Sequence, residues 1–166
     1  FHFSPGKLRN HARDLLFLCG EGYSLHVCNL RPKSRGEIRL ASGDPMAPPE
    51  IRANYLTHPD DLEHMVRGFK LARRILGAKA FDRYRGEEIV PGRDVVSDDD
   101  IRQFIRNKAE TIYHPIGTCK MGSDPLAVVD AELRVHGLTG LRVVDASIMP
   151  LLVGGNTNGP TVMIAE

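Results

Sequence analysis

The segment Tyr113-His-Pro-Ile-Gly-Thr-Cys-Lys-Met-Gly122 places one histidine inside a compact turn of the chain. Pro115 disfavours a helical conformation for the residue before it, so a helix cannot easily continue through His114. Gly117 and Thr118 then predict a tight turn. A histidine fixed in this way can present one ring nitrogen in a set direction and exchange a proton near neutral pH. Spacing alone leaves two interpretations open, a hydrogen-bonded structural histidine and a proton-transferring one.

Downstream, residues 154–161 form a glycine-flanked loop that leads into a helix, with Pro160 in the first helical position and Asn158 or Gly159 as its cap. The loop resembles a phosphate-binding loop superficially, but Pro160 occupies the position where that motif needs lysine. The N–H groups and positive dipole end of such a helix favour a partly negative ligand atom. Helix capping without any ligand explains the same residues, and both interpretations stay open.

Upstream of the histidine, the hydrophobic pattern predicts short strands. Residues 24–30 and 36–42 alternate roughly and are separated by a turn-like segment, which predicts an antiparallel hairpin with Ile38 and Leu40 facing a core. After the histidine, the apolar run 141–144 predicts a buried strand that ends just before Asp145.

Two helices are also expected. Pro59 and the acidic residues after it are typical of a first helical turn, and Gly77 is a plausible end. Ser97 begins a second helix by capping it near Asp100. The apolar residues of the first helix recur at helical spacing: Leu62, Met65, Val66, Phe69, Ala72 and Leu76.

Composition narrows the classes of function. With 166 residues, 42% of them hydrophobic, the chain can bury a core, and a net charge of +1 gives no case for a nucleic-acid partner. No apolar run approaches the ~20 residues needed to span a bilayer.

Three cysteines, Cys19, Cys28 and Cys119, cannot all pair, which predicts reduced thiols in a cytoplasmic protein. No metal-ligand spacing and no Gly-x-Ser-x-Gly elbow occurs, so neither a metal site nor a metal-dependent or serine hydrolase is expected.

Four segments, 30–36, 113–122, 140–150 and 155–161, together and in this order resemble the C-terminal part of the glucose–methanol–choline (GMC) family of flavin-dependent alcohol oxidoreductases, especially its choline-dehydrogenase-like branch. The resemblance covers nearly the whole chain and corresponds to about the last third of a full-length member. It implies an α+β fold, with an antiparallel sheet backed by helices and a C-terminal strand–loop–helix that completes an absent FAD domain. Residues 1–112 would form the substrate-side domain, and residues 113–166 the active-site segment that returns to the flavin.

The resemblance also implies roles for single residues. His114 matches the family's active-site base, which accepts the hydroxyl proton of a primary alcohol while a hydride leaves for the flavin. Asn158 matches the second catalytic position, which is His or Asn in this family. The positions that match flavin-contacting residues are Asp145, Ala146, Asn156, Thr157 and Pro160.

One departure from the family pattern is large, because the glycine-rich FAD-binding motif Gly-x-Gly-x-x-Gly does not occur in these 166 residues. The expected partners are therefore an N-terminal FAD-binding domain and a small alcohol, and a homo-oligomer or domain swap is possible for the chain alone. We expect that the chain alone neither holds FAD tightly nor turns over alcohol. The alternative is a stand-alone binding or scaffold module that keeps the fold without the chemistry.

Overall fold

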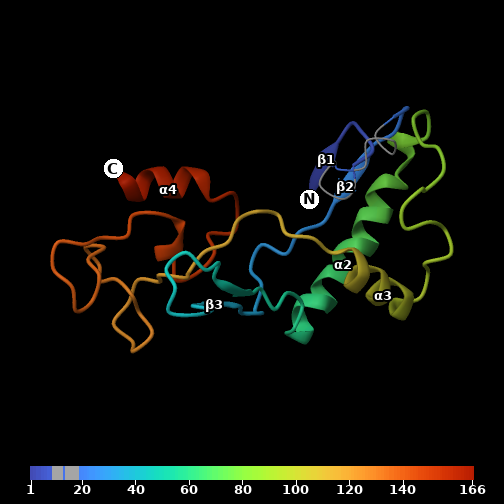
Figure 1. Ribbon diagram of the computed structural model, residues 1–166. Coiled ribbons are helices and arrows are strands. Elements are labelled where there is room, and N and C mark those ends of the chain that lie inside the picture. Colours follow the sequence, from blue (N-terminus) through green and yellow to red (C-terminus); the bar gives the residue numbers. More distant parts are fainter. Residues whose placement is uncertain (9–12, 14–18) are drawn as a thin grey trace. The chain divides into compact units, whose positions relative to one another are not determined.

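The computed structural model describes residues 1–8, 13 and 19–166. Two compact units are present, and each contains two separate stretches of chain (Figure 1). The first unit comprises Phe1–Asn29 and Leu56–Glu110, and the second comprises Leu30–Tyr55 and Thr111–Glu166. These units are defined by contacts within each of them, and residues 30–55 belong with the C-terminal stretch. The predicted boundary between residues 112 and 113 separates two functional parts, the substrate side and the flavin side, and it stays a prediction.

The longest helix of the first unit, α2, runs over Pro59–Leu76 as the sequence predicts. Its N-cap is His58, whose Nδ1 accepts a hydrogen bond from the N–H of Asp60 at 3.2 Å. Acidic residues occupy the first turn and basic residues the last, which suits the helix dipole. Gly77 is the C-cap, so both predicted ends are confirmed.

The second helix, α3, covers Asp98–Lys108. Ser97 Oγ accepts a hydrogen bond from the N–H of Asp100, and the Asp100 carboxylate accepts one from the N–H of Ser97, each at 3.1 Å. This reciprocal capping box confirms the start expected at Ser97.

The core of the first unit lies between α2 and α3, which contact each other (Figure 1). Four aliphatic side chains are buried there, namely Leu62, Val66, Ile101 and Ile105. Burying each such side chain contributes about 1.5–3 kcal/mol. Arg102 of α3 also reaches across to Glu63 of α2, with 2.7 Å between Nε and Oε1. The amphipathic pattern of these helices is thus explained by their mutual packing.

A loop after α2 is tied back to that helix. It contains the short 3-10 helix η2, Lys79–Phe81. Arg73 donates to the Glu88 carboxylate at 2.6 Å and to the carbonyl of Gly92 at 2.9 Å, and its guanidinium lies 4.6 Å from the centre of the Phe69 ring. Arg73 therefore joins a charged, a polar and an aromatic contact in one place.

Two small antiparallel sheets replace the predicted hairpin. In the first unit β1 (His2–Ser4) pairs with β2 (Ser24–His26), and in the second β3 (Glu37–Arg39) pairs with β4 (Glu50–Arg52). The predicted pairing of residues 24–30 with residues 36–42 is therefore wrong. Alternation shows that a segment is extended but does not identify its partner. The glycine- and proline-rich residues 43–49 form part of the connection between β3 and β4.

The predicted burial of the second strand is wrong too. Ile38 is 50% exposed and Leu40 is 88% exposed. Ile38 lies opposite Ile51, which is 68% exposed, so this apolar pair forms one open face of the sheet.

The second unit is mostly irregular chain. Its regular elements besides β3 and β4 are the 3-10 helix η3 (Ala146–Ile148) and α4 (Asn158–Ala165). Isolated bridges join Val129 to Met121 and to Val135, and Val129 is fully buried. Ile148 and Met149 are buried as well, so the short apolar segments after residue 120 supply the interior of this unit.

The buried strand predicted over residues 141–144 is not formed. Leu141 is 50% exposed and Val144 is 41% exposed, and Arg142 makes a single bridge with Arg134. Only three of these four side chains are apolar, and the fourth, Arg142, suits an extended segment at the surface.

The α+β class with small antiparallel sheets and helices is confirmed. In the residues that the structure describes, no helix has the length and apolar character required to cross a membrane. Cys28 and Cys119 take part in no disulfide.

Candidate active site

His114 lies in the second unit and is half-buried. Its Nδ1 atom is 3.0 Å from Oγ1 of Thr157 and 3.4 Å from the backbone nitrogen of the same residue. Among the described residues these are the hydrogen bonds that the ring makes, and Nε2 has no protein partner. One ring nitrogen is thus anchored and the other is available.

The backbone around His114 is unusual. Tyr113 has a φ of 63°, a conformation that bulky residues adopt rarely. Gly117 has a φ of 83°, and a Cβ there would lie 3.3 Å from the carbonyl oxygen of Met149. The predicted turn is present, and it needs glycine for both reasons. Strained backbone next to a polar side chain is frequent at functional sites.

Backbone hydrogen bonds join the histidine segment to η3. The N–H of Cys119 donates to the carbonyl of Ser147 at 3.0 Å, and the N–H of Met121 donates to the carbonyl of Ile148 at 2.8 Å. Because both acceptors lie in η3, the His114 turn and the segment that begins at Asp145 form one local framework.

Asp145 caps η3 and is exposed. Its Oδ1 accepts a hydrogen bond from the N–H of Ser147 at 2.7 Å. Hydrogen bonds from the hydroxyl and the N–H of Ser147 lower the pKa of the Asp145 carboxyl below its usual value. Asp145 therefore supplies a fixed negative charge beside the half-buried Ala146.

Helix α4 starts one to two residues earlier than predicted. Thr157, not Asn158 or Gly159, is the N-cap, and Pro160 is the third helical residue rather than the first. Pro160 is tolerated there because N–H groups in the first helical turn have no partner within the helix. Thr157 is therefore the residue that both begins α4 and contacts His114.

The start of α4 presents polar groups that have no partner in the protein. Asn156 and Asn158 are exposed, and their side chains make no hydrogen bond to the described residues. Nothing lies within 4 Å of the position that a Cβ would take at Gly155 or Gly159. The loop and the first turn of α4 therefore offer amide donors to an open space.

These contacts bring together part of the predicted site. His114 meets Thr157, the residue before Asn158, while Asp145 and Ala146 are linked to the His114 segment through η3. No direct hydrogen bond joins His114 to Asn158 among the described residues. The catalytic and flavin-binding roles of these residues remain predictions.

Sequence reasoning missed two features. The hydroxyl of Thr157 bonds the histidine, although the resemblance indicated only a flavin contact for it. A Cβ on Gly154, whose φ is 80°, would lie 3.1 Å from the Arg31 guanidinium, so Arg31 packs against the loop before α4. A threonine before Asn-Gly-Pro was the available signal for the first feature, and no local pattern indicates the second.

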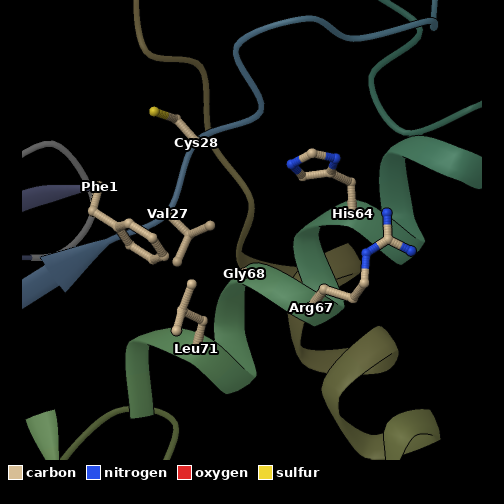
Figure 2. A pocket seen from close by; sticks show the side chains of 7 residues that line it. All are labelled: Phe1, Val27, Cys28, His64, Arg67, Gly68 and Leu71. Atoms are coloured by element: carbon tan, nitrogen blue, oxygen red, sulfur yellow. The ribbon is translucent and has the colours of Figure 1, made fainter. Parts of the chain in front are cut away.

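A separate hollow of about 200 Å³ lies in the first unit (Figure 2). It forms where the chain after β2 approaches α2, and a Cβ on Gly68 would lie 2.5 Å from Cγ1 of Val27. Figure 2 shows Val27 beside Gly68 and Leu71, with His64 and Arg67 farther along the helix. The lining residues are Phe1, Val27, Cys28, His64, Arg67, Gly68 and Leu71, and none of them is a predicted catalytic residue.

Comparison with known protein families gives one match that covers most of the chain. Residues 32–165 match the family described as GMC oxidoreductase. The chain is 55% identical over its full length to an alcohol dehydrogenase [acceptor] of Pseudomonas putida, of which it covers 30%. It is 47% identical to an oxygen-dependent choline dehydrogenase of Cronobacter sakazakii, of which it covers 29%. The chain thus spans about a third of the length of such relatives.

Solved structures of oxidases also resemble this chain. Pyridoxine 4-oxidase from Mesorbium loti matches 82% of this chain with a TM-score of 0.76 and 38% identity, and the match covers 26% of that chain. A fungal aryl-alcohol oxidase matches 81% with a TM-score of 0.73 and 33% identity, over 22% of its own length.

Proposed function

The chain belongs to the GMC oxidoreductase family, and on that basis we propose that it is the C-terminal part of an FAD-dependent enzyme that oxidises a primary alcohol to an aldehyde. The observation that carries the proposal is the anchored ring of His114, whose Nδ1 is bonded and whose Nε2 is open. Residues 1–112 would form the substrate side, and residues 113–166 would contact the flavin.

The residues at the start of α4 fit one part of FAD, the electron-rich edge of its ring system. They offer unpartnered backbone N–H groups at the positive end of a helix, where Gly155 and Gly159 leave room for close approach. The glycine-rich motif that binds the rest of a dinucleotide is absent from the sequence. The fit therefore supports a chain that completes a flavin site whose larger part is elsewhere.

Bound FAD would supply the acceptor for the hydride that leaves the alcohol carbon. The part of this chain is proton transfer at Nε2 of His114. When the alcohol O–H bond breaks, its proton moves to Nε2 and its electron pair remains on oxygen. The increased electron density on oxygen makes loss of the hydride from the adjacent carbon easier. General-base assistance of this kind contributes about 10²–10⁴-fold to a rate.

Asn158 has a different role in this scheme. Its carboxamide cannot exchange protons near neutral pH, but its NH₂ group can donate a hydrogen bond to the substrate oxygen. The exposed, unpartnered side chain of Asn158 at the first position of α4 supports that role. His114 is then the member of the pair that takes up the proton, and Asn158 stabilises the charge that develops on oxygen.

The test is a substrate screen with the full-length enzyme under anaerobic conditions. Primary alcohols, including choline, are mixed with the oxidised protein, and loss of flavin absorbance is followed. Bleaching by at least one alcohol, with formation of the aldehyde in equal amount, supports the proposal. A flavin-loaded protein that no alcohol reduces, or a full-length protein that binds no flavin, favours the scaffold module instead.

A further inference from the structure

Thr157 is an N-cap residue that does not cap its own helix. A threonine at this position normally turns its hydroxyl to the N–H of the second or third helical residue. Here the third residue is Pro160, which has no N–H, and the Thr157 side chain makes no capping hydrogen bond. The hydroxyl lies 3.0 Å from Nδ1 of His114 instead. Pro160 thus removes one of the two usual donors. The other, the N–H of Gly159, is not used either, and the backbone of Thr157 is helical (φ −85°, ψ −9°) where an N-cap is typically extended.

Thr157 is held firmly enough to position that partner. The residue is buried, with 8% of its surface exposed. Its carbonyl accepts hydrogen bonds from Oγ1 of Thr161 at 2.7 Å and from the N–H of Thr161 at 2.9 Å. The residue at the start of α4 is thus fixed from inside the helix, and the imidazole is fixed by it.

We propose that Thr157 is a positioning residue that accepts a hydrogen bond from Nδ1–H of His114 and so keeps Nε2 as the bare, reacting nitrogen. The inference rests on the proposed function, because it deepens the role of His114 in that reaction. A neutral imidazole carries one proton, so a proton on Nδ1 leaves a lone pair on Nε2. The hydroxyl oxygen is a suitable acceptor for that proton.

The backbone N–H of Thr157 opposes this tautomer. It points toward Nδ1 at 3.4 Å and would favour a bare Nδ1. The hydroxyl contact at 3.0 Å is compatible with both tautomers, because a hydroxyl can accept as well as donate. A base at Nε2 requires the Nδ1–H tautomer, and the Thr157 hydroxyl is the acceptor that the described residues offer to that proton. No charged side chain of the described residues forms an ion pair or hydrogen bond with His114, so Thr157 is the residue whose removal tests the tautomer.

Oxidation of the alcohol moves one proton to the imidazole ring of His114. The alcohol proton goes to Nε2, and the proton on Nδ1 stays in place. The resulting imidazolium still donates a hydrogen bond from Nδ1 to Oγ1 of Thr157. Because the donor is now charged, this hydrogen bond is stronger than the one made by the neutral ring. Thr157 thereby stabilises the product of the proton transfer as well as the orientation of the ring.

The experiment compares the full-length, flavin-loaded enzyme with its T157V, T157S and T139V variants. Valine has the shape of threonine without the hydroxyl, and Thr139 is an exposed threonine in the same unit that serves as the matched control. The first readout is the ¹⁵N chemical shift of both ring nitrogens of His114, assigned by loss of its signals in H114Q. The second is the rate of flavin reduction by substrate under anaerobic conditions.

In the wild type and in T157S we expect the Nδ1–H tautomer of neutral His114. In T157V the proton moves toward Nε2, and flavin reduction slows about tenfold, the effect typical of losing one hydrogen bond to a charged group. T139V changes neither quantity. Rescue by T157S separates positioning from a packing effect, because serine restores the hydroxyl without the methyl group.

A wild-type His114 protonated on Nε2 overturns the inference, whatever the variants do. So does a T157V enzyme with the wild-type tautomer and rate. Failure of the proposed function has a different signature, since H114Q then reduces flavin as fast as the wild type does.

Discussion

Oγ1 of Thr157 lies 3.0 Å from Nδ1 of His114, although 43 residues separate the two in the chain. The first residue begins a helix, and the second stands in a strained turn between Tyr113 and Pro115. The contact links two of the four segments that resemble the GMC family, 113–122 and 155–161. It also determines which ring nitrogen is open.

Asn158 gives a prediction that separates chemistry from stability. Its side chain is exposed and makes no hydrogen bond to the described residues, so N158A is expected to leave the thermal unfolding temperature of the full-length enzyme unchanged. Removing a donor to the developing charge on oxygen is expected to lower kcat about a hundredfold. Steady-state kinetics measure this, with N107A on the surface of α3 as the control. Equal kcat for N158A and N107A would contradict the role of Asn158.

Gly36 gives a prediction about the fold. A Cβ at this position would lie 2.7 Å from the carbonyl oxygen of Ala53, and a second backbone carbonyl, that of Arg52, is closer still. Because backbone atoms at the β3–β4 sheet cannot move aside easily, G36A is expected to destabilise the second unit by about 1–3 kcal/mol. Urea unfolding followed by hydrogen exchange in residues 34–55 measures this change.

The matched control for G36A is G43A, because nothing lies within 4 Å of the Cβ position at Gly43. We expect G43A to leave exchange in the same residues close to wild type. If the two variants destabilise equally, the close approach at Gly36 is not what fixes this sheet.

Asp100 gives a prediction with a definite pH dependence. Hydrogen bonds from the hydroxyl and the N–H of Ser97 lower the pKa of its carboxyl. A carboxyl whose pKa is lower in the folded state contributes stability above its unfolded pKa of about 3.9 and loses that contribution as the pH falls through the folded value. D100N should therefore weaken hydrogen-exchange protection of α3 at pH 7, and its difference from wild type should shrink below about pH 4.

The control for D100N is D94N, which changes an exposed carboxyl that makes no hydrogen bond to the described residues. Protection of α3 in D94N should match the wild type at each pH. A D100N effect that is constant from pH 7 to pH 3 would show that the capping carboxylate is not its source.

The helices of this chain were predictable because their signals are local. Capping at Ser97, proline at position 59 and the spacing from Leu62 to Leu76 depend on neighbours within one or two turns. Strand pairing is not local, so the partner of β3 could not be found from its alternation, and the exposed Leu40 was assigned to a core. In the candidate active site, too, local features could be predicted and contacts between distant segments could not. The turn at His114 follows from Pro115 and Gly117, whereas its bond to Thr157 depends on two distant segments meeting in space.

The absent dinucleotide motif leads to a prediction for the 166-residue chain on its own. The residues at the start of α4 fit only one edge of the flavin, and the sequence contains no Gly-x-Gly-x-x-Gly. The chain should therefore purify without flavin absorbance and show no saturable FAD binding at micromolar concentration by fluorescence titration. A yellow preparation would mean that these residues hold the cofactor without a further domain.

The most direct measurement of the central claim is the rate of anaerobic flavin reduction by substrate in the full-length enzyme and its H114Q variant. If His114 is the base, H114Q retains its flavin absorbance and reduces it about 10²–10⁴-fold more slowly. H64Q, which changes an exposed histidine on α2, should react at the wild-type rate. Flavin reduction by H114Q at a rate close to that of H64Q would contradict the account.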